Sequence, residues 1–292
     1  MEAWETMKLP LLACLLLPAL LVYLGLHIVR RGIIFVDLAL AQVAALGTCW
    51  CVMLGHDPHD IHTYWWSIAF TLAGALIFTF TRTSEPHRVP QEALIGIVYV
   101  VAAAASIVLL SKSPGSNEEL QRTLIGDVLF VTGPQIWKTF LLYVAIAVVH
   151  FIFRKKFIAL TFSGERSDVS WTTRGWDFLF YALFGLVVTS FVQIGGVLLV
   201  FTYLIVPAVC ANLLAKSLGV LLAVGTLIAA LGGIGGLYAS YQFNMPTGAA
   251  LVCTFGAVLL VVGTFAKLRN GRRQSMTPPL KQSQGSAIGE PQ

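Results

Sequence analysis

The chain has 292 residues, of which 57% are hydrophobic and only 11% are charged, and its formal net charge is +5. A chain with so few charges is predicted to be an integral membrane protein. The basic residues are spread over several segments and do not form one patch with interleaved aromatic residues, which argues against nucleic-acid binding. A soluble catalytic domain is excluded as well, because the longest polar connections, at 112–135 and 154–175, are only about 20 residues long.

Apolar runs of about 20 residues recur along the chain, and this is the length at which a helix crosses the hydrocarbon core of a bilayer. They predict an all-α fold, a polytopic bundle of transmembrane helices at about 9–29, 33–54, 63–81, 93–111, 136–153, 177–194, 195–215, 218–240 and 247–266. The boundary between the sixth and seventh runs depends on Gln193, Gly195 and Gly196, which would allow a tight interhelical turn. Without that turn the nine spans become eight.

The domain organisation follows from the runs. Residues 1–266 form the predicted membrane domain, and the first run is expected to remain as a membrane anchor because it is too long for a signal-peptide core. Residues 267–292 are rich in Arg, Gln, Ser, Pro and Gly, a composition typical of a disordered tail.

Lysine and arginine fall unevenly on the two sides of the predicted spans. With the N terminus outside, only Lys8, Lys112, Arg122 and Lys138 of the 19 basic residues lie on the outer side. The other fifteen lie on the inner side, which the positive-inside rule assigns to the cytoplasm. The tail is therefore predicted to be cytoplasmic.

Asp37 is the one carboxylate that this division places inside a span. An ionisable residue at that depth is costly and usually faces a cavity or a charged partner. Carboxylate oxygen is a ligand that manganese and zinc accept, so Asp37 is a candidate for a cation path. The alternative is that Asp37 lies near the cytoplasmic end of its span and pairs with Arg30 or Arg31.

Most other polar residues in the apolar runs have ordinary structural explanations. His27 and His150 lie near span ends, where they are expected to reach the interface. Glu92 follows Pro90 at a predicted helix start and is expected to interact favourably with the dipole of its own helix. The five cysteines all fall in apolar runs and are interpreted as packed thiols.

One predicted outer loop is unusually rich in metal-binding residue types: it contains His56, Asp57, His59, Asp60 and His62. Imidazole and carboxylate groups suit borderline cations, and His59 and His62 could face the same way on a helical turn. The loop is therefore a possible external metal site. The alternative, which we favour, is a solvated loop interrupted by Pro58, because no further ligand completes a tetrahedral site.

Five short elements resemble, in order, the permease subunits of the zinc/manganese-type ABC importers. The first starts at Arg30 and Arg31 and continues through Asp37 to Gly47; the others are Glu92–Ile97, Leu124–Leu129, Gly195–Ala208 and Gly235–Ser240 with Pro246. Each element alone would be weak, but together they extend over nearly the whole chain. The resemblance implies a type II ABC importer permease in a bacterial inner membrane, surrounded by membrane lipid.

The resemblance also implies partners and site residues. The expected partners are a cytoplasmic ATP-binding subunit, an extracytoplasmic metal-binding protein and a second permease copy, giving a homodimer or a heterodimer. The permease itself would be no enzyme and would hold no stable cofactor, since ATP would bind the partner and a divalent metal ion would be transported. The segment containing Pro207, Ala208, Asn212 and Lys216 is where the family contacts the ATPase, and Pro207 is expected to bend the helix.

Two positions depart from the family pattern. Gln42 stands near the position of the family histidine, and Asn244 stands where the family tends to have aspartate. Asp37, Gln42 and Asn244 are accordingly assigned to the metal path, with Gln42 equally able to form an interhelical hydrogen bond. Loss of the ionisable ligands leaves alternatives open: a permease for a metal chelate or an organic cofactor, or a membrane scaffold that transports nothing.

Overall fold

The computed structural model describes residues 2–57, 60–81, 90–111, 126, 128–162 and 170–275. Within these ranges the regular secondary structure is helical. The longer helices are α3 (Val36–Met53), α4 (Ile61–Thr81), α5 (Gln91–Leu110), α7 (Gly133–Ile152), α9 (Trp171–Leu214), α10 (Leu218–Phe243) and α11 (Thr247–Ser275). Eight spans of the described chain, including one built from α1 and α2, are long and apolar enough to cross a membrane. The predicted all-α membrane bundle is confirmed.

The first span consists of two helices that continue one another. α1 (Glu2–Leu16) ends just before α2 (Pro18–Arg31), and proline is tolerated in the first turn of a helix because its missing N–H is not needed there. Together they provide the apolar span Met7–Arg31. The span ends at Gly32, whose φ of 68° gives the left-handed conformation common after a helix C terminus.

The longest helix, α9, is broken at Gly196, where φ is 71° and ψ is 172°. An unbroken helix would separate positions 191 and 203 by about 18 Å along its axis. The ring centroids of Phe191 and Tyr203 are nevertheless 5.8 Å apart, so the chain bends sharply between them. The break lies at the predicted boundary between the sixth and seventh runs, and each half of α9 has close to the ~20 residues that a span needs.

A close backbone approach fixes this break. Gly126, with a φ of 66°, lies directly against the backbone of Gly195 and Gly196, and a Cβ atom at Gly126 would overlap both residues. The dihedrals of α9 depart from helical values at Gly196 and not at Pro207, so the bend expected at the proline is found earlier in the chain.

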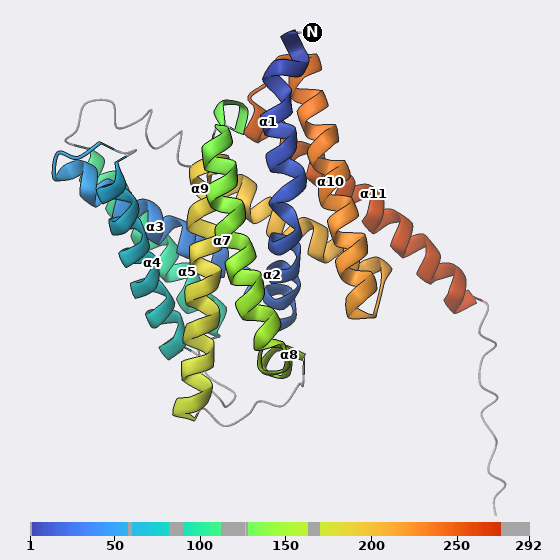
Figure 1. Cartoon of the computed structure of the whole chain (residues 1–292). Helices are drawn as coiled ribbons and strands as arrows, with labels where there is room; N and C mark the ends of the chain where they lie inside the picture. Colours follow the sequence, from blue (N-terminus) through green and yellow to red (C-terminus); the bar gives the residue numbers. More distant parts are fainter. Residues whose placement is uncertain are drawn as a thin grey trace, which may run out of the picture.

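α9 is the centre of the bundle. It contacts α2, α3, α4, α7, α10 and α11, and it also touches the short helix α8 (Arg154–Phe162). Phe180, Tyr181, Phe184 and Tyr203 of α9 are among the largest fully buried side chains. α3, α4 and α5 pack together on one side of α9, whereas α1, α2, α10 and α11 lie on the other (Figure 1).

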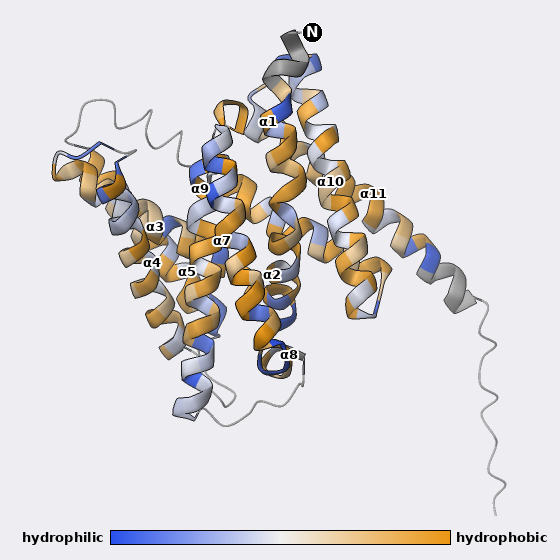
Figure 2. Ribbon diagram, viewed as in Figure 1, coloured by the Kyte–Doolittle hydropathy of each residue, from blue (hydrophilic) through white to orange (hydrophobic). Residues whose placement is uncertain are grey.

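The outward faces of the helices are apolar, as expected where lipid is the solvent (Figure 2). Exposed side chains include Val101 of α5, Leu141 of α7 and Leu260 of α11. α8 lies at the end of the bundle opposite the N terminus (Figure 1). The last helix continues past the predicted boundary at 266 to Ser275, and the remainder of the predicted tail lies outside the described residues.

Candidate functional site

Asp37 lies in the first turn of α3 and is only 1% exposed. Its Oδ1 atom accepts a hydrogen bond from the backbone N–H of Leu38 at 2.8 Å. The Oδ2 atom is buried and has no hydrogen-bond partner among the described residues. A buried carboxylate oxygen without a partner is costly, and a bound cation or a proton would relieve that cost.

Arg31 does not neutralise Asp37, so the part of the expected alternative that pairs Asp37 with Arg31 is wrong. Arg31 instead forms a salt bridge with Asp177 of α9, with 3.1 Å between Nη1 and Oδ1. The side chains are 8% and 0% exposed, respectively. Asp37 is therefore left without Arg31 as a counter-ion inside the protein.

Glu92 adds a second carboxylate to the beginning of α3. Although it lies in the first turn of α5, its Oε1 atom accepts a hydrogen bond from the backbone N–H of Phe35 at 2.9 Å. Glu92 thus caps a neighbouring helix two residues before Asp37. Its Oε2 atom is buried and also lacks a hydrogen-bond partner among the described residues. Two carboxylates from different helices therefore lie at the same helix terminus. The sequence pattern at Pro90 predicted only an interaction of Glu92 with its own helix.

The other two residues assigned to the metal path lie differently. Gln42 is 3% exposed within α3, and the interhelical hydrogen bond expected of it is not found among the described residues. Asn244 is exposed and follows α10 in the left-handed conformation, with a φ of 51°. α10 ends beside the N terminus, whereas α2 leads into α3 at the opposite end of the bundle (Figure 1). Asp37 and Asn244 are therefore not brought together.

A buried polar cluster ties α2 to α8 and α9. We define this polar cluster as His27, Arg31, His150, Thr161 and Asp177. Thr161 Oγ1 lies 2.8 Å from His27 Nδ1 and accepts a hydrogen bond from Arg31 Nε at 3.1 Å. The guanidinium carbon of Arg31 also lies 3.9 Å from the centroid of the Phe180 ring. These contacts hold three helices together at the end of the bundle opposite the N terminus.

Sequence reasoning missed this polar cluster. His27 and His150 are 0% and 2% exposed, so their side chains are covered by the protein and do not reach outward as expected of residues at the interface. The Nδ1 atom of His150 lies 3.1 Å from the backbone oxygen of Ile146 in its own helix. Asp177 is a second carboxylate inside the bundle: it is the first residue of the predicted run, whereas α9 begins earlier, at Trp171, and buries Asp177 within its length. The salt bridge between Arg31 and Asp177 joins residues 146 positions apart, so no local sequence pattern predicts it.

The outer loop brings two histidines together, His56 and His62. The pair suggested by helical spacing, His59 and His62, includes a residue outside the described residues. The ring centroids of His56 and His62 are 5.5 Å apart, and both side chains are exposed. Asp60 Oδ1 accepts a hydrogen bond from the backbone N–H of Ile61, while His59 lies outside the described residues. Among the described residues, no group of three or more His, Cys, Asp or Glu side chains could hold a metal ion.

Comparison with known families decides the class of protein. Residues 3–266 match the model of the ABC 3 transport family. The chain belongs to the ABC 3 transport family. This agrees with the family resemblance of the five sequence elements and with the helical bundle described above.

Relatives and solved structures agree with this family. The chain is 28% identical over 244 residues to the manganese transport system membrane protein MntC of Listeria innocua, covering 83% of this chain and 84% of that protein. It is 26% identical to the manganese import system permease protein ScaB of Streptococcus gordonii, covering 81% and 83% of the two chains. The structure of PsaBC from Streptococcus pneumoniae in complex with Fab matches with a TM-score of 0.73 at 23% identity, covering 89% of this chain and 93% of that one.

A metal-chelate type ABC transporter in an inward-facing conformation has the same fold. Its TM-score is 0.66 at 17% identity, and the match covers 88% of this chain and 85% of that one. Family membership and the eight apolar spans establish the chain as a multi-pass membrane transport protein.

The segment by which this ABC 3 family member is expected to contact its ATPase lies at the end of α9. Pro207 and Ala208 are buried within the helix, and Asn212 Nδ2 donates a hydrogen bond to the backbone oxygen of Ala208 at 2.8 Å. Lys216 is exposed in the short connection to α10. Arg269 Nη2 of α11 donates to the backbone oxygen of Leu213 at 3.2 Å, which satisfies a carbonyl group in the last turn of α9.

Proposed function

We propose that the chain is the membrane-spanning permease subunit of a bacterial ABC importer that translocates a divalent metal cation, with manganese as the first candidate. The observation that carries this proposal is the unpartnered, buried Oδ2 atom of Asp37 in a family whose similar members are named for manganese transport. Glu92 supplies further carboxylate oxygen at the same helix terminus. Oxygen ligands suit manganese, whereas loss of the family histidine at Gln42 removes a nitrogen ligand that zinc favours.

The energy for transport comes from a separate cytoplasmic ATP-binding subunit in this proposal. That subunit would contact the end of α9 around Asn212 and Lys216, so that closure of the ATPase dimer moves α9 and α10. A second permease copy would complete the path, and an extracytoplasmic binding protein would deliver the ion. With the two halves of α9 each crossing the membrane on either side of the break at Gly196, the N terminus would face outward and the end of α11 would face the cytoplasm. This orientation agrees with the distribution of basic residues.

The pair of His56 and His62 would be the first contact of the chain with an incoming ion. Two imidazole nitrogens bound to one metal at ~2.1 Å place their ring centroids roughly 5 Å apart. The observed centroid distance of 5.5 Å is close to this value, and Asp57 and Asp60 provide carboxylates nearby in the chain. We infer that the pair receives the ion weakly and passes it on. The expected result is that the double substitution of His56 and His62 by alanine slows uptake at limiting metal. His87→Ala, in the connection between the runs 63–81 and 93–111 that is predicted to be cytoplasmic, should have no effect.

The proposal is tested by deleting the gene and measuring cellular manganese, zinc, iron and cobalt under chelator limitation. A selective fall in manganese, restored by the wild-type gene and not by Asp37→Ala, is the expected result. Unchanged metal contents in a strain lacking redundant importers would contradict it.

A second candidate is a permease for a metal chelate. The amides of Gln42 and Asn244 favour it, because they replace ionisable ligands of the family by neutral groups. Uptake of a radiolabelled metal that rises when a chelator is added, and falls when the free ion is supplied alone, would distinguish this candidate from a permease for the bare cation.

A further inference from the structure

An apolar groove runs along the outside of the bundle between α7 and α10. The α1–α2 span forms its floor, and α7 and α10 stand on either side of that span (Figure 1). The groove has a volume of about 550 Å³, within the range of ligand-binding clefts. Its lining includes Leu20 of α2, Phe140, Val144 and Ala147 of α7, and Leu222 of α10. A groove of this composition on the lipid-facing surface suits a hydrocarbon chain.

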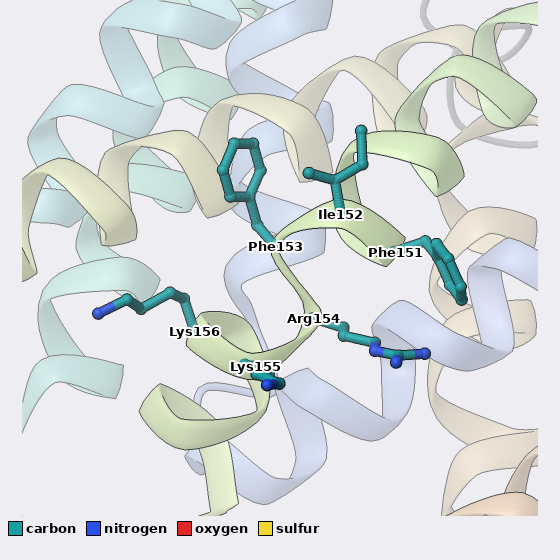
Figure 3. A pocket seen from close by; sticks show the side chains of 6 residues that line it. All are labelled: Phe151, Ile152, Phe153, Arg154, Lys155 and Lys156. Carbon is teal, nitrogen blue, oxygen red and sulfur yellow. The ribbon is translucent and has the colours of Figure 1, made fainter.

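The α8 end of the groove is basic. Arg154 lines the groove and also lines an adjoining hollow of about 340 Å³ together with Lys155 and Lys156. Figure 3 shows Arg154 and Phe151 extending to the same side of the turn between α7 and α8, while Lys156 extends to the other side. The guanidinium carbon of Arg154 lies 4.7 Å from the Phe151 ring centroid. None of the described residues lining the groove or the hollow is acidic.

We propose that the groove binds an anionic phospholipid, with an acyl chain along the apolar part and the phosphate against Arg154. Lys155 and Lys156 are exposed and add to the attraction for the headgroup. A positive group at the end of an apolar groove matches the two parts of such a lipid, because the phosphate lies at the interface and the acyl chain lies deeper. The proposal does not depend on the transported ion.

Charge also decides between a lipid and a second copy of the chain. In a two-fold symmetric contact, the same surface patch is used by both copies. A contact through this groove would bring the basic residues of two copies toward one another, and like charges in close contact are unfavourable. An anionic lipid instead neutralises them.

The test measures lipid binding to the purified full-length permease by native mass spectrometry, with phosphatidylglycerol and phosphatidylcholine carrying the same acyl chains. The wild type should bind one phosphatidylglycerol with higher affinity than phosphatidylcholine. Arg154→Gln should weaken phosphatidylglycerol binding about fivefold, the factor expected for one basic residue near an anionic headgroup, and leave phosphatidylcholine unchanged. Lys138→Gln, a change of one charge at the other end of α7, is the matched control and should have no effect.

A second variant tests the apolar part of the site. Ala147 is exposed and lines the groove, so Ala147→Trp should fill it and weaken binding of both lipids without a change in charge. Ala147→Leu, a smaller intrusion, should give an intermediate loss and guards against misfolding of the tryptophan variant. Equal binding by wild type, Arg154→Gln and Ala147→Trp would overturn the proposal. The proposal would also be overturned if the Ala147→Trp variant became monomeric where the wild type is a dimer and still bound phosphatidylglycerol, because the groove would then be a contact between copies.

Discussion

The salt bridge between Arg31 and Asp177 should be a major contribution to the stability of the bundle. Both side chains are almost fully buried, and removing one member of a buried ion pair leaves an uncompensated charge at a cost of about 3–5 kcal/mol. In Asp177→Ala, Arg31 keeps its hydrogen bond to Thr161 and its contact with the Phe180 ring. Because a cation over an aromatic ring contributes about 0.5–2 kcal/mol, we expect the loss to lie near 3 kcal/mol.

Arg31→Ala should cost more, near 4–5 kcal/mol, since it removes the salt bridge, the Thr161 hydrogen bond and the ring contact at once. The double variant should be less destabilised than the sum of the two single variants by about 2 kcal/mol, because each single change already breaks the same pair. The assay is the free energy of unfolding of the purified protein in mixed micelles, followed by circular dichroism during titration with a denaturing detergent.

A matched control is available on the same helix as Asp177. The guanidinium carbon of Arg174 lies 5.3 Å and 5.6 Å from the ring centroids of Phe80 and Trp171, farther than the 3.9 Å between Arg31 and Phe180. Unlike Arg31, Arg174 forms no salt bridge with any of the described residues. Arg174→Ala should therefore cost less than about 1 kcal/mol. If Asp177→Ala is no more destabilising than Arg174→Ala, or if the effects of the Arg31 and Asp177 variants simply add, the reasoning about this salt bridge is wrong.

Three further outcomes follow from the described contacts, each measured as the free energy of unfolding or as metal uptake. Gly25→Ala should destabilise by about 1–3 kcal/mol, because a Cβ atom would meet the backbone oxygen of Leu204, and Gly96→Ala, where nothing lies within 4 Å, should not. Gly196→Ala should destabilise by about 1 kcal/mol or more, because alanine is strained at a φ of 71°. Equal stability of Gly196→Ala and the wild type would contradict the observed break. Glu92→Gln should keep the hydrogen bond to the Phe35 N–H, and therefore the stability, but reduce uptake. Glu92→Ala should reduce both stability and uptake. Unchanged uptake by Glu92→Gln would show that the charge of Glu92 plays no part in the cation path.

The spans could be predicted from sequence because each depends on a local property, the length of an apolar run. The break in α9 could also be predicted from local sequence, because Gly195 and Gly196 lie at the break itself. The contacts of Asp177 and Glu92 could not be predicted in this way. Asp177 meets Arg31 across 146 positions and Glu92 meets Phe35 across 57, so both contacts depend on how the helices pack.

The histidines show the same limit. His27 and His150 lie near the ends of apolar runs, and position along a run predicts the interface. The neighbouring helices α8 and α9 bury both side chains. The sequences of α2 and α7 alone do not show which other helices pack against them. Asp37 was recognised as a candidate because a carboxylate in an apolar run stands out locally, but its lack of Arg31 as a partner required the structure.

The most direct test of the central claim is ATP-driven uptake of radioactive manganese into proteoliposomes that contain the permease with its ATPase and binding protein. Asp37→Asn keeps the size of the side chain and removes its charge. We expect uptake by this variant to fall at least tenfold while its stability is equal to or above that of the wild type, because a buried charge without a partner has been removed. Wild-type uptake rates in Asp37→Asn would contradict the claim that the carboxylate lies on the cation path.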